Sequence, residues 1–373
     1  MNSDPRVLRQ IAFFRKYNFE IVLSGLTYQG SDAFYPLVKE KSRLSRAVKL
    51  GVMVARLCRP RVKEFLHNSS FGELSSHPVE FDLIIANDAE TWPLAIALKD
   101  SHANAKIVFD AHEFYPRQFT DDLKWNWFHK RFANFLCKKF IRQADVLITV
   151  CDGLADAYST YTSKEIPVVL NAPKYQSKLK PNATTGTIRL VHHGIANRSR
   201  KIEKMIELMD SLDSRFELNF MLMPTDEAYF QELKIMSEGK AINFLDTVET
   251  EAIPSYLNQF DIGLFYLEPV NFNYTFALPN KFFEFIQARL AIAIGPSTEM
   301  KRIVEKESLG VVAEEFDVLK LAYSLNSLTS KDIDQLKANT DRVARKYSAD
   351  QHDNFYLELI QKWKLHSEIV DFS

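Results

Sequence analysis

The feature that most constrains the fold is a series of short, nearly continuous apolar runs, separated by longer segments with helical spacing. Runs without polar alternation are typical of strands buried on both faces of a parallel sheet that helices cover. They form two groups: 20–25, 81–87, 106–112, 146–150 and 166–171, then 188–194, 218–223, 242–245, 261–267, 290–295 and 309–314. The sequence therefore predicts an α/β protein with two doubly wound, Rossmann-like domains that face a cleft.

A polar segment, 173–187, lies between the two groups and has no apolar period, which is typical of a linker. We therefore expect an N-terminal domain over 1–172 and a C-terminal domain over 188–346. The length of 373 residues suits two such domains. Residues 347–373 carry apolar side chains at helical spacing, which predicts a terminal helix with a buried face.

Charge and cysteine content exclude several classes of protein. A formal net charge of −1 gives no overall field that would attract nucleic acid. The three cysteines have no paired spacing, so neither a disulfide framework nor a zinc ribbon is expected. The first residues lack the features of a secretory leader, and no run reaches the roughly 18 apolar residues that a membrane span needs. We expect a cytoplasmic protein.

The segment 42–66 is basic, with seven Lys and Arg against one acidic residue. Its apolar and basic positions separate on a helical wheel, and Pro60 predicts a kink. Such a surface can lie peripherally on the anionic inner face of a plasma membrane. An ordinary surface helix has the same pattern, so both interpretations stay open.

The most informative constellation lies in 273–295, where a loop precedes a short helix and a buried strand. Pro279 and Asn280 suit the start of that helix, whose free N–H groups and dipole favour phosphate. Lys281 adds positive charge, and Glu284, one turn further on, can accept two hydrogen bonds from a ribose diol. Spacing alone equally allows that Lys281 and Glu284 form a solvated helix face.

A second constellation lies in 192–206, where a strand ends at a glycine and a basic turn precedes an amphipathic helix. Gly194 would let the backbone approach a ligand closely. Arg198 and Arg200 stand where a diphosphate needs countercharge, and Arg can bind two oxygens at once. Solvated charges at a helix start are the alternative interpretation.

A third constellation follows a strand of the first domain at 109–119. His112 and Glu113 lie there in a loop, a position where polar groups are often functional. Asp88 follows the preceding strand and either faces the same space or caps a helix. Because no HExxH spacing occurs, we expect no metal site, and His112 suits substrate binding or proton transfer. The P-loop and dinucleotide signatures GxxxxGK[ST] and GxGxxG are also missing.

Taken together, these segments resemble the retaining glycosyltransferases of family 4, which have the GT-B fold, over nearly the whole chain. Segment 278–295 is the most specific match and resembles the family's donor site, while 4–25, 84–99 and 109–116 are similar to segments of its first domain. The resemblance implies that Glu284 binds the nucleotide ribose. It further implies that Arg200 and Lys281 serve the diphosphate, and that His112 approaches the transferred sugar near the acceptor. The final helix would pack back onto the first domain.

Three departures from the family pattern accompany this resemblance. Phe276 occupies the position of a family glutamate that contacts the donor sugar, and Arg289 replaces a glycine in the turn between helix and strand. Only three residues precede Asp4, so we expect the family's first strand and its glycine-rich loop to be absent.

The resemblance implies transfer of a sugar from a nucleotide diphosphate sugar to a hydroxyl of a glycan acceptor. We expect a lipid-linked acceptor in bacterial surface polysaccharide synthesis, and charge stabilisation of the departing diphosphate without a metal ion. The departures leave two alternatives open. One is a non-catalytic GT-B subunit that binds a sugar nucleotide or partners an active transferase, and the other is a sugar-nucleotide epimerase.

Overall fold

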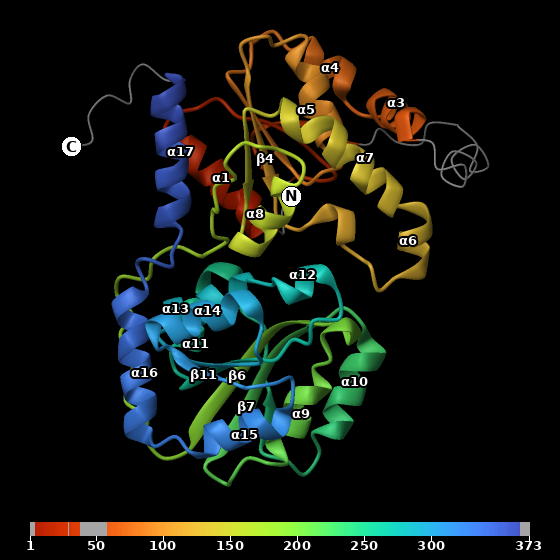
Figure 1. The fold of residues 1–373 in the computed structure, drawn as a ribbon. Coiled ribbons are helices and arrows are strands. Elements are labelled where there is room, and N and C mark those ends of the chain that lie inside the picture. Colours follow the sequence, from red (N-terminus) through yellow and green to blue (C-terminus); the bar gives the residue numbers. More distant parts are fainter. Residues whose placement is uncertain (1–3, 29, 38–57, 366–373) are drawn as a thin grey trace. The chain divides into compact units, whose positions relative to one another are not determined.

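The computed structural model describes residues 4–28, 30–37 and 58–365. The chain forms two compact units, shown in Figure 1. The residues up to Val169 and those from Asp353 onward form unit 1, and Leu170–His352 forms unit 2. We describe each unit by itself.

Unit 1 is built on a parallel sheet in the order β3-β4-β5, and a second parallel pair, β1-β2, lies apart from it. The strands are β1 (Val22–Gly25), β2 (Ala33–Pro36), β3 (Leu83–Asn87), β4 (Lys106–Ala111) and β5 (Val146–Thr149). The helices are α1 (Pro5–Lys16), α3 (Cys58–Asn68), α4 (Phe71–Ser75), α5 (Trp92–Lys99), α6 (Leu123–Phe128), α7 (Lys130–Phe140), α8 (Asp152–Ser159) and α17 (Asp350–Trp363), with 3₁₀ turns η1 (Tyr115–Arg117) and η2 (Ile141–Gln143).

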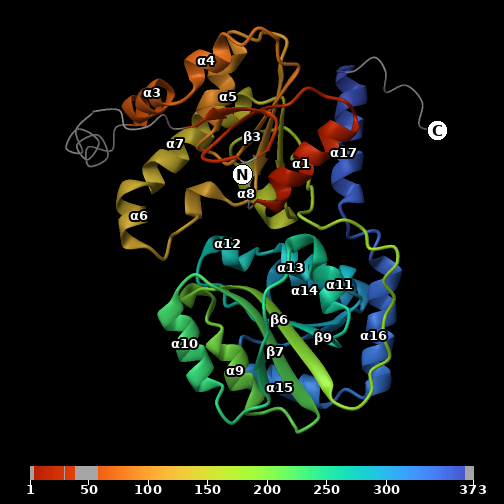
Figure 2. The same cartoon turned by 180° about the vertical axis from the view of Figure 1, so that it is seen from behind.

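Helices α1 and α17 cover one face of this sheet and lie side by side in Figure 2. Helix α1 begins with Pro5 after an N-cap at Asp4, whose carboxylate accepts from the backbone N–H of Arg6 at 2.9 Å. Phe14 of α1 packs with Tyr356 of α17 and with the strand residues of the same core. Chain ends that are far apart in sequence therefore complete one hydrophobic core.

One sequence prediction in unit 1 is wrong, and one strand was not predicted. A strand was expected over 166–171, but only Val168 bridges to Thr149 there. Pro167 has no N–H to donate, and the chain leaves the sheet toward unit 2 directly afterwards. Strand β2 was not predicted, because it has only four residues and none of them is β-branched.

Unit 2 contains one parallel sheet in the order β11-β10-β9-β6-β7-β8. The strands are β6 (Ile188–Ala196), β7 (Phe216–Pro224), β8 (Ile242–Phe244), β9 (Ile262–Phe265), β10 (Ala291–Ile294) and β11 (Gly310–Val312). The helices are α9 (Glu203–Met209), α10 (Glu227–Met236), α11 (Ile253–Leu257), α12 (Phe272–Thr275), α13 (Asn280–Gln287), α14 (Thr298–Glu307), α15 (Val318–Asn326) and α16 (Ser330–Val343), with 3₁₀ turns η3 (Arg198–Arg200) and η4 (Thr250–Ala252).

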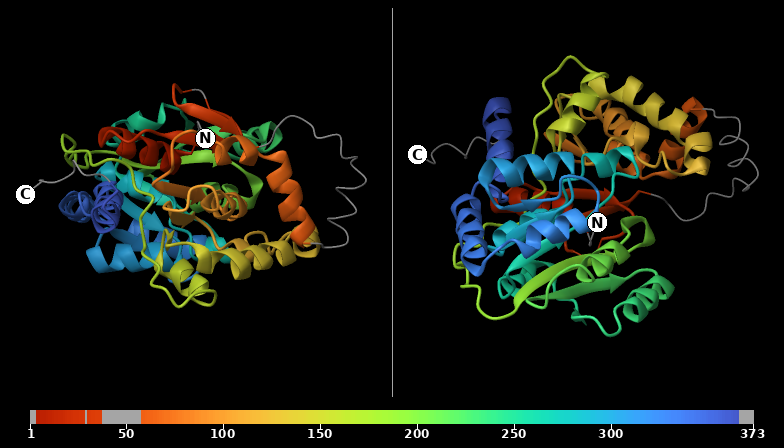
Figure 3. Two further views of the ribbon diagram at one scale, coloured as in Figure 1. Left: turned by 90° about the horizontal axis from the view of Figure 1, so that it is seen from above. Right: turned by 60° about the horizontal axis from the view of Figure 1, so that its bottom comes forward.

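Helices α9, α10 and α15 pack on one face of this sheet, and α13 and α14 contact it through β9 and β10 on the other. The right-hand view of Figure 3 shows α9 and α10, in green, beside strands β6 and β7. From β6 the chain builds the sheet outward through β7 and β8, then returns to β9 on the other side of β6. Such a reversal of strand order is where open α/β sheets bind ligands, at the carboxyl ends of the strands.

In the part of the chain that the structure describes, no helix combines the length and the apolar character that crossing a membrane requires. Most of the basic segment, 42–57, lies outside the described residues, and its remainder forms the first part of α3.

Candidate functional site

In unit 2, the carboxyl end of β6 meets the start of α13. Gly194 has a φ of 130°, which side-chain-bearing residues rarely adopt. A Cβ atom at Gly194 would lie 2.8 Å from Lys281 Nζ and 3.7 Å from Arg200 Nη1. The structure thus brings together three residues from two separate predicted constellations, around a backbone segment that only glycine suits. We call Gly194, Arg200, Lys281 and Glu284 the unit 2 cluster.

Lys281 is buried, with 6% of its surface exposed. Its Nζ donates to the backbone oxygen of His193 at 2.6 Å and lies 3.5 Å from His192 Nε2. Burial lowers the pKa of Lys281 well below its ordinary value, and Arg200 lowers it further, while Glu284 acts in the opposite direction. An anion bound beside Lys281 would favour its protonated form and so offset the effects of burial and Arg200.

Glu284 is also buried, one turn after Lys281 on α13. Its Oε2 lies 3.2 Å from His193 Nε2, without the alignment of a hydrogen bond. Burial lowers the pKa of His193 well below its ordinary value, with Lys281 contributing, so this histidine is neutral at pH 7.

The first turn of α13 has no side-chain cap. Pro279 occupies the N-cap position in an extended conformation, and among the described residues no side chain caps the helix. The Phe282 N–H donates to the backbone oxygen of Pro279 at 3.0 Å. Asn280 Oδ1 is buried, and within the described residues no hydrogen-bond partner reaches it. The helix dipole and the first N–H groups, which lack a side-chain cap, favour an anion at this position.

Arg198 is placed differently from the other predicted donor-binding residues. Its guanidinium makes a bidentate pair with Glu232, at 2.6 and 2.8 Å, and lies 3.3 Å from Asp226. It also lies over the Tyr229 ring, at 4.9 Å from the centroid. These contacts hold an exposed side chain against α10, and none of them links it to the unit 2 cluster.

In unit 1, His112 belongs to a buried network at the carboxyl end of β4. His112 Nε2 lies 3.4 Å from Asp110 Oδ1. The other Asp110 oxygen accepts from Arg6 Nε at 2.6 Å and from Gln10 Nε2 at 2.8 Å. Gln10 Oε1 accepts in turn from Asn87 Nδ2 at 3.0 Å, so the ends of β3 and β4 are tied to α1.

Charges in this network fix the protonation of its members. Although burial opposes ionisation, Arg6 and His112 hold the pKa of Asp110 well below its usual range. Burial likewise opposes the charged form of His112, yet Asp110 raises the pKa of that imidazole above its ordinary value. His112 is therefore better suited to donate a hydrogen bond or a positive charge than to act as a general base at neutral pH.

The two predicted acceptor-side carboxylates lie at the same edge of the unit 1 sheet. Asp88 follows β3 with a φ of 68°, and its N–H donates to the backbone oxygen of Asp110 at 3.2 Å. Glu113 follows His112, is exposed, and accepts from Gln118 Nε2 at 2.6 Å. Both carboxylates are accessible beside His112.

Sequence reasoning did not single out five residues that shape these sites: Arg6, Gln10, Asp110, His192 and His193. For Asp110, His192 and His193 the available signal was a polar side chain inside an otherwise apolar strand run, which is costly unless the group is partnered. Arg6 and Gln10 lie in helix α1, where no such signal was available. Across the described residues, no group of three or more His, Cys, Asp or Glu side chains forms a candidate metal site.

No family model matches the sequence, and no curated protein matches it either. Solved structures do match in fold. A mutant of TarM from S. aureus, in complex with fondaparinux, alpha-GlcNAc-glycerol and UDP, matches with a TM-score of 0.62 and 12% identity over 78% of this chain. This chain spans only 59% of the length of that TarM chain.

Two further matches cover most of both chains. The N-terminal domain of trehalose-6-phosphate phosphatase from Candida albicans has a TM-score of 0.62 and 12% identity, over 89% of this chain and 84% of that one. An E. coli trehalose-6-phosphate protein bound with UDP-2-fluoro glucose has the same TM-score and identity, over 86% and 83%. Identity this low establishes architecture alone, so the family 4 assignment stays a prediction. The predicted architecture is confirmed, because this chain has the GT-B fold of two Rossmann-like units.

Proposed function

We propose that this protein is a glycosyltransferase that moves a sugar from a nucleotide diphosphate sugar to a hydroxyl of a glycan acceptor. The observation that carries the proposal is the convergence of Gly194, Arg200, Lys281 and Glu284 at the start of α13. Support also comes from the GT-B neighbours, of which one was solved with UDP and one with UDP-2-fluoro glucose.

Each member of the unit 2 cluster has a role in this proposal. Arg200, Lys281 and the free N–H groups of α13 stabilise the charge that develops on the departing diphosphate. Gly194 lets those phosphates approach the backbone, and Glu284 accepts hydrogen bonds from the ribose. Because the cluster supplies its own countercharge, we propose that transfer needs no metal ion. Retention of anomeric configuration belongs to the same proposal through the family resemblance.

On the acceptor side, we propose that His112 contributes positive charge near the transferred sugar, with Asp88 and Glu113 contacting hydroxyl groups. We further propose a lipid-linked acceptor in bacterial surface polysaccharide synthesis. The protein would then work in the cytoplasm, with the basic segment 42–66 resting on the anionic inner face of the membrane.

The first experiment is a thermal-shift screen of UDP, GDP, ADP and CMP and their common sugars, in buffer containing EDTA. We expect one nucleotide class to raise the Tm saturably, because a ligand that binds only the folded state stabilises it. Glu284→Ala should lose this shift, whereas Glu232→Ala, an exposed carboxylate paired with Arg198, should keep it. No shift with any nucleotide, or an equal shift in Glu284→Ala, would contradict the donor site.

One observation favours the non-catalytic alternative. Phe276, at the position of the family's sugar-binding glutamate, packs against Phe272 with ring centroids 4.9 Å apart. A turnover assay separates the possibilities. Transfer or slow donor hydrolysis, lowered by about 100-fold in Arg200→Ala, supports the transferase. Saturable donor binding with neither reaction supports a binding subunit, and interconversion of the donor sugar without any acceptor supports an epimerase.

A further inference from the structure

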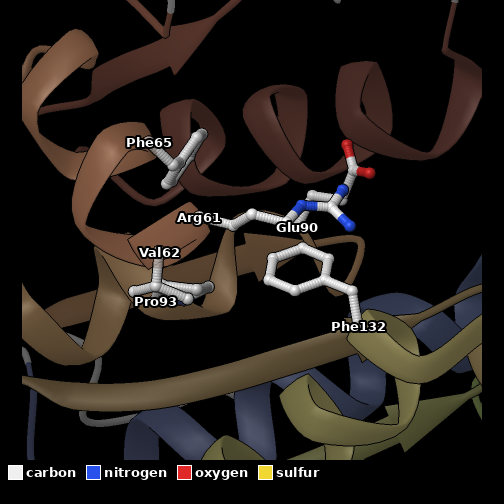
Figure 4. Close-up of a pocket in the computed structure, with 6 residues that line it drawn as sticks. All are labelled: Arg61, Val62, Phe65, Glu90, Pro93 and Phe132. Atoms are coloured by element: carbon white, nitrogen blue, oxygen red, sulfur yellow. The ribbon is translucent and has the colours of Figure 1, made fainter. Parts of the chain in front are cut away.

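Unit 1 contains a cavity of about 160 Å³ between α3, the start of α5 and α7 (Figure 4). The side chains that line it are Arg61, Val62, Phe65, Glu90, Pro93 and Phe132. A basic and an acidic group therefore share a cavity whose other lining residues are apolar. Its volume is below that of a drug-sized pocket and suits a ligand of about one sugar ring.

The Arg61 guanidinium is incompletely partnered. It lies over the Phe132 ring, 3.8 Å from the centroid, and Nη1 donates to the backbone oxygen of Phe128 over a long 3.4 Å. Over the described ranges, no carboxylate oxygen approaches it within the 4.0 Å of an ion pair. Burial lowers the pKa of Arg61, although Tyr115 and Glu90 act in the opposite direction. Most of the five N–H donors of the Arg61 guanidinium therefore remain available to an external acceptor.

Glu90 provides the complementary group. Its Oε1 accepts from the Tyr115 hydroxyl at 2.6 Å, which fixes the orientation of the carboxylate. A carboxylate has about four lone-pair positions, so Glu90 can also accept from a ligand hydroxyl. Phe65 and Pro93 supply apolar surface for the C–H groups of a sugar. The Arg61 guanidinium can bind an acidic group, and the Glu90 carboxylate can accept from a hydroxyl. Together with the apolar lining, they suit a sugar that carries an acidic group.

The cavity also adjoins the acceptor-side residues. Glu90 comes two residues after Asp88, in the connection from β3 to α5, and Tyr115 comes three residues after His112, beyond β4. Both connections leave the carboxyl ends of parallel strands, where ligands bind in open α/β sheets. This position favours a substrate over a remote effector.

We infer that this cavity binds an acidic sugar unit of the acceptor, with its carboxylate or phosphate on Arg61 and a hydroxyl on Glu90. The inference rests on the proposed glycosyltransferase function and makes the acceptor an acidic glycan. It concerns binding to unit 1, so it can be measured without any nucleotide.

Titration calorimetry tests the inference with glucuronate and glucose 6-phosphate as acidic probes and glucose as the neutral control. At least one acid should bind about tenfold more tightly than glucose, because charge-assisted hydrogen bonds to Arg61 are worth about that factor. Arg61→Gln should weaken acid binding about tenfold and leave glucose unchanged. Arg59→Gln removes the same charge from an exposed position on α3 and should have less than about a twofold effect.

Two further variants guard against a loss of folding in Arg61→Gln. Arg61→Lys keeps the charge without the fork, so acid binding should be intermediate. Glu90→Gln removes a like charge, so acid binding should stay equal or become stronger. Equal binding of glucose and both acids, no binding of either acid to the wild-type protein, or weaker acid binding in Glu90→Gln would overturn the inference.

Transfer assays distinguish an acceptor subsite from a site for a free sugar phosphate. With an acceptor that ends in uronic acid, Arg61→Gln should raise the acceptor KM and leave the thermal shift by the preferred nucleotide unchanged. An unchanged acceptor KM, with weakened glucose 6-phosphate binding, would overturn the acceptor assignment. If acids bind as expected while no nucleotide shifts the Tm, the proposed function fails and the sugar site in unit 1 stands.

Discussion

Lys281 is a lysine that the fold keeps out of water, where burial first and then Arg200 lower its pKa. Its location one residue into a helix was readable from the sequence, and so was that of Glu284. Their burial was not, because it depends on how α13 packs against β6 and β9. Sequence spacing therefore singled out Lys281 and Glu284 but could not distinguish a solvated helix face from a buried site.

Replacing Lys281 with Met should separate stability from ligand binding. The unfolded chain binds a proton at Lys281 below pH 10.5, and the folded chain does so only below the lowered pKa, so stability rises with pH between the two values. We expect Lys281→Met to be at least as stable as the wild type at pH 7 and to lose this rise. Urea unfolding from pH 7 to 9.5 measures both effects.

The nucleotide shift provides the second readout for the same variant. Lys281→Met should lose most of the stabilisation by the preferred nucleotide, since the apolar side chain offers no countercharge. A variant that is less stable than the wild type but still responds fully to nucleotide would show that Lys281 is structural. Lys204→Met, which removes a partly exposed lysine paired with Glu207, is the control.

The turn between α13 and β10 shows how one element accommodates an unexpected residue. Arg289 has a φ of 64°, so this turn needs a positive φ, which glycine adopts most readily. The side chain is fully buried, and its Nε donates to Asp341 at 2.6 Å. Further bonds run to the backbone oxygens of Gln287, at 2.6 Å, and Gln176, at 2.8 Å. These bonds join the start of unit 2 to α13 and α16 and offset the backbone strain.

Two substitutions at this turn should rank in a defined order. Arg289→Ala keeps the strained φ and loses the buried bonds, which should cost about 3 kcal/mol of unfolding free energy. Arg289→Gly loses the same bonds but relieves about 1 kcal/mol of strain, so it should be the more stable variant. Ser308→Gly, at a φ of 56°, relieves strain with little bonding to lose and should stabilise. Denaturant unfolding measures the free energy of unfolding of each variant. A larger value for Arg289→Ala than for Arg289→Gly would contradict the expected order.

Strands were more predictable than the contacts between them. Ten of the expected runs became strands because continuous apolar stretches of Val, Ile and Leu suit a sheet covered on both faces. The run at 166–171 did not form a strand, because Pro167 has no N–H to donate to a neighbouring strand. The apolar pattern gives no information about such missing donors. The network around Asp110 could not be predicted, because its partners Arg6 and Gln10 lie about a hundred residues away.

At the scale of the whole molecule, the proposed donor residues all lie within Leu170–His352. Unit 2 has its own six-stranded sheet and its own hydrophobic core. We therefore expect residues 170–352 expressed alone to fold cooperatively and to show the same nucleotide preference as the full chain. Thermal unfolding with and without nucleotide tests this. A fragment that folds without responding to nucleotide would mean that donor binding needs groups from unit 1.

Unit 1 cannot be completed in the same way, because α17 supplies part of its core from the far end of the sequence. During synthesis the residues of unit 1 before Val169 leave the ribosome first. Phe14, Val108 and Ile148 lack their packing partners Tyr356 and Ile360 until α17 emerges. Unit 2, although second in the chain, has all its residues available earlier. The nascent protein must therefore carry an open apolar surface while unit 2 is being made, which makes the emergence of α17 the step that commits unit 1 to its fold.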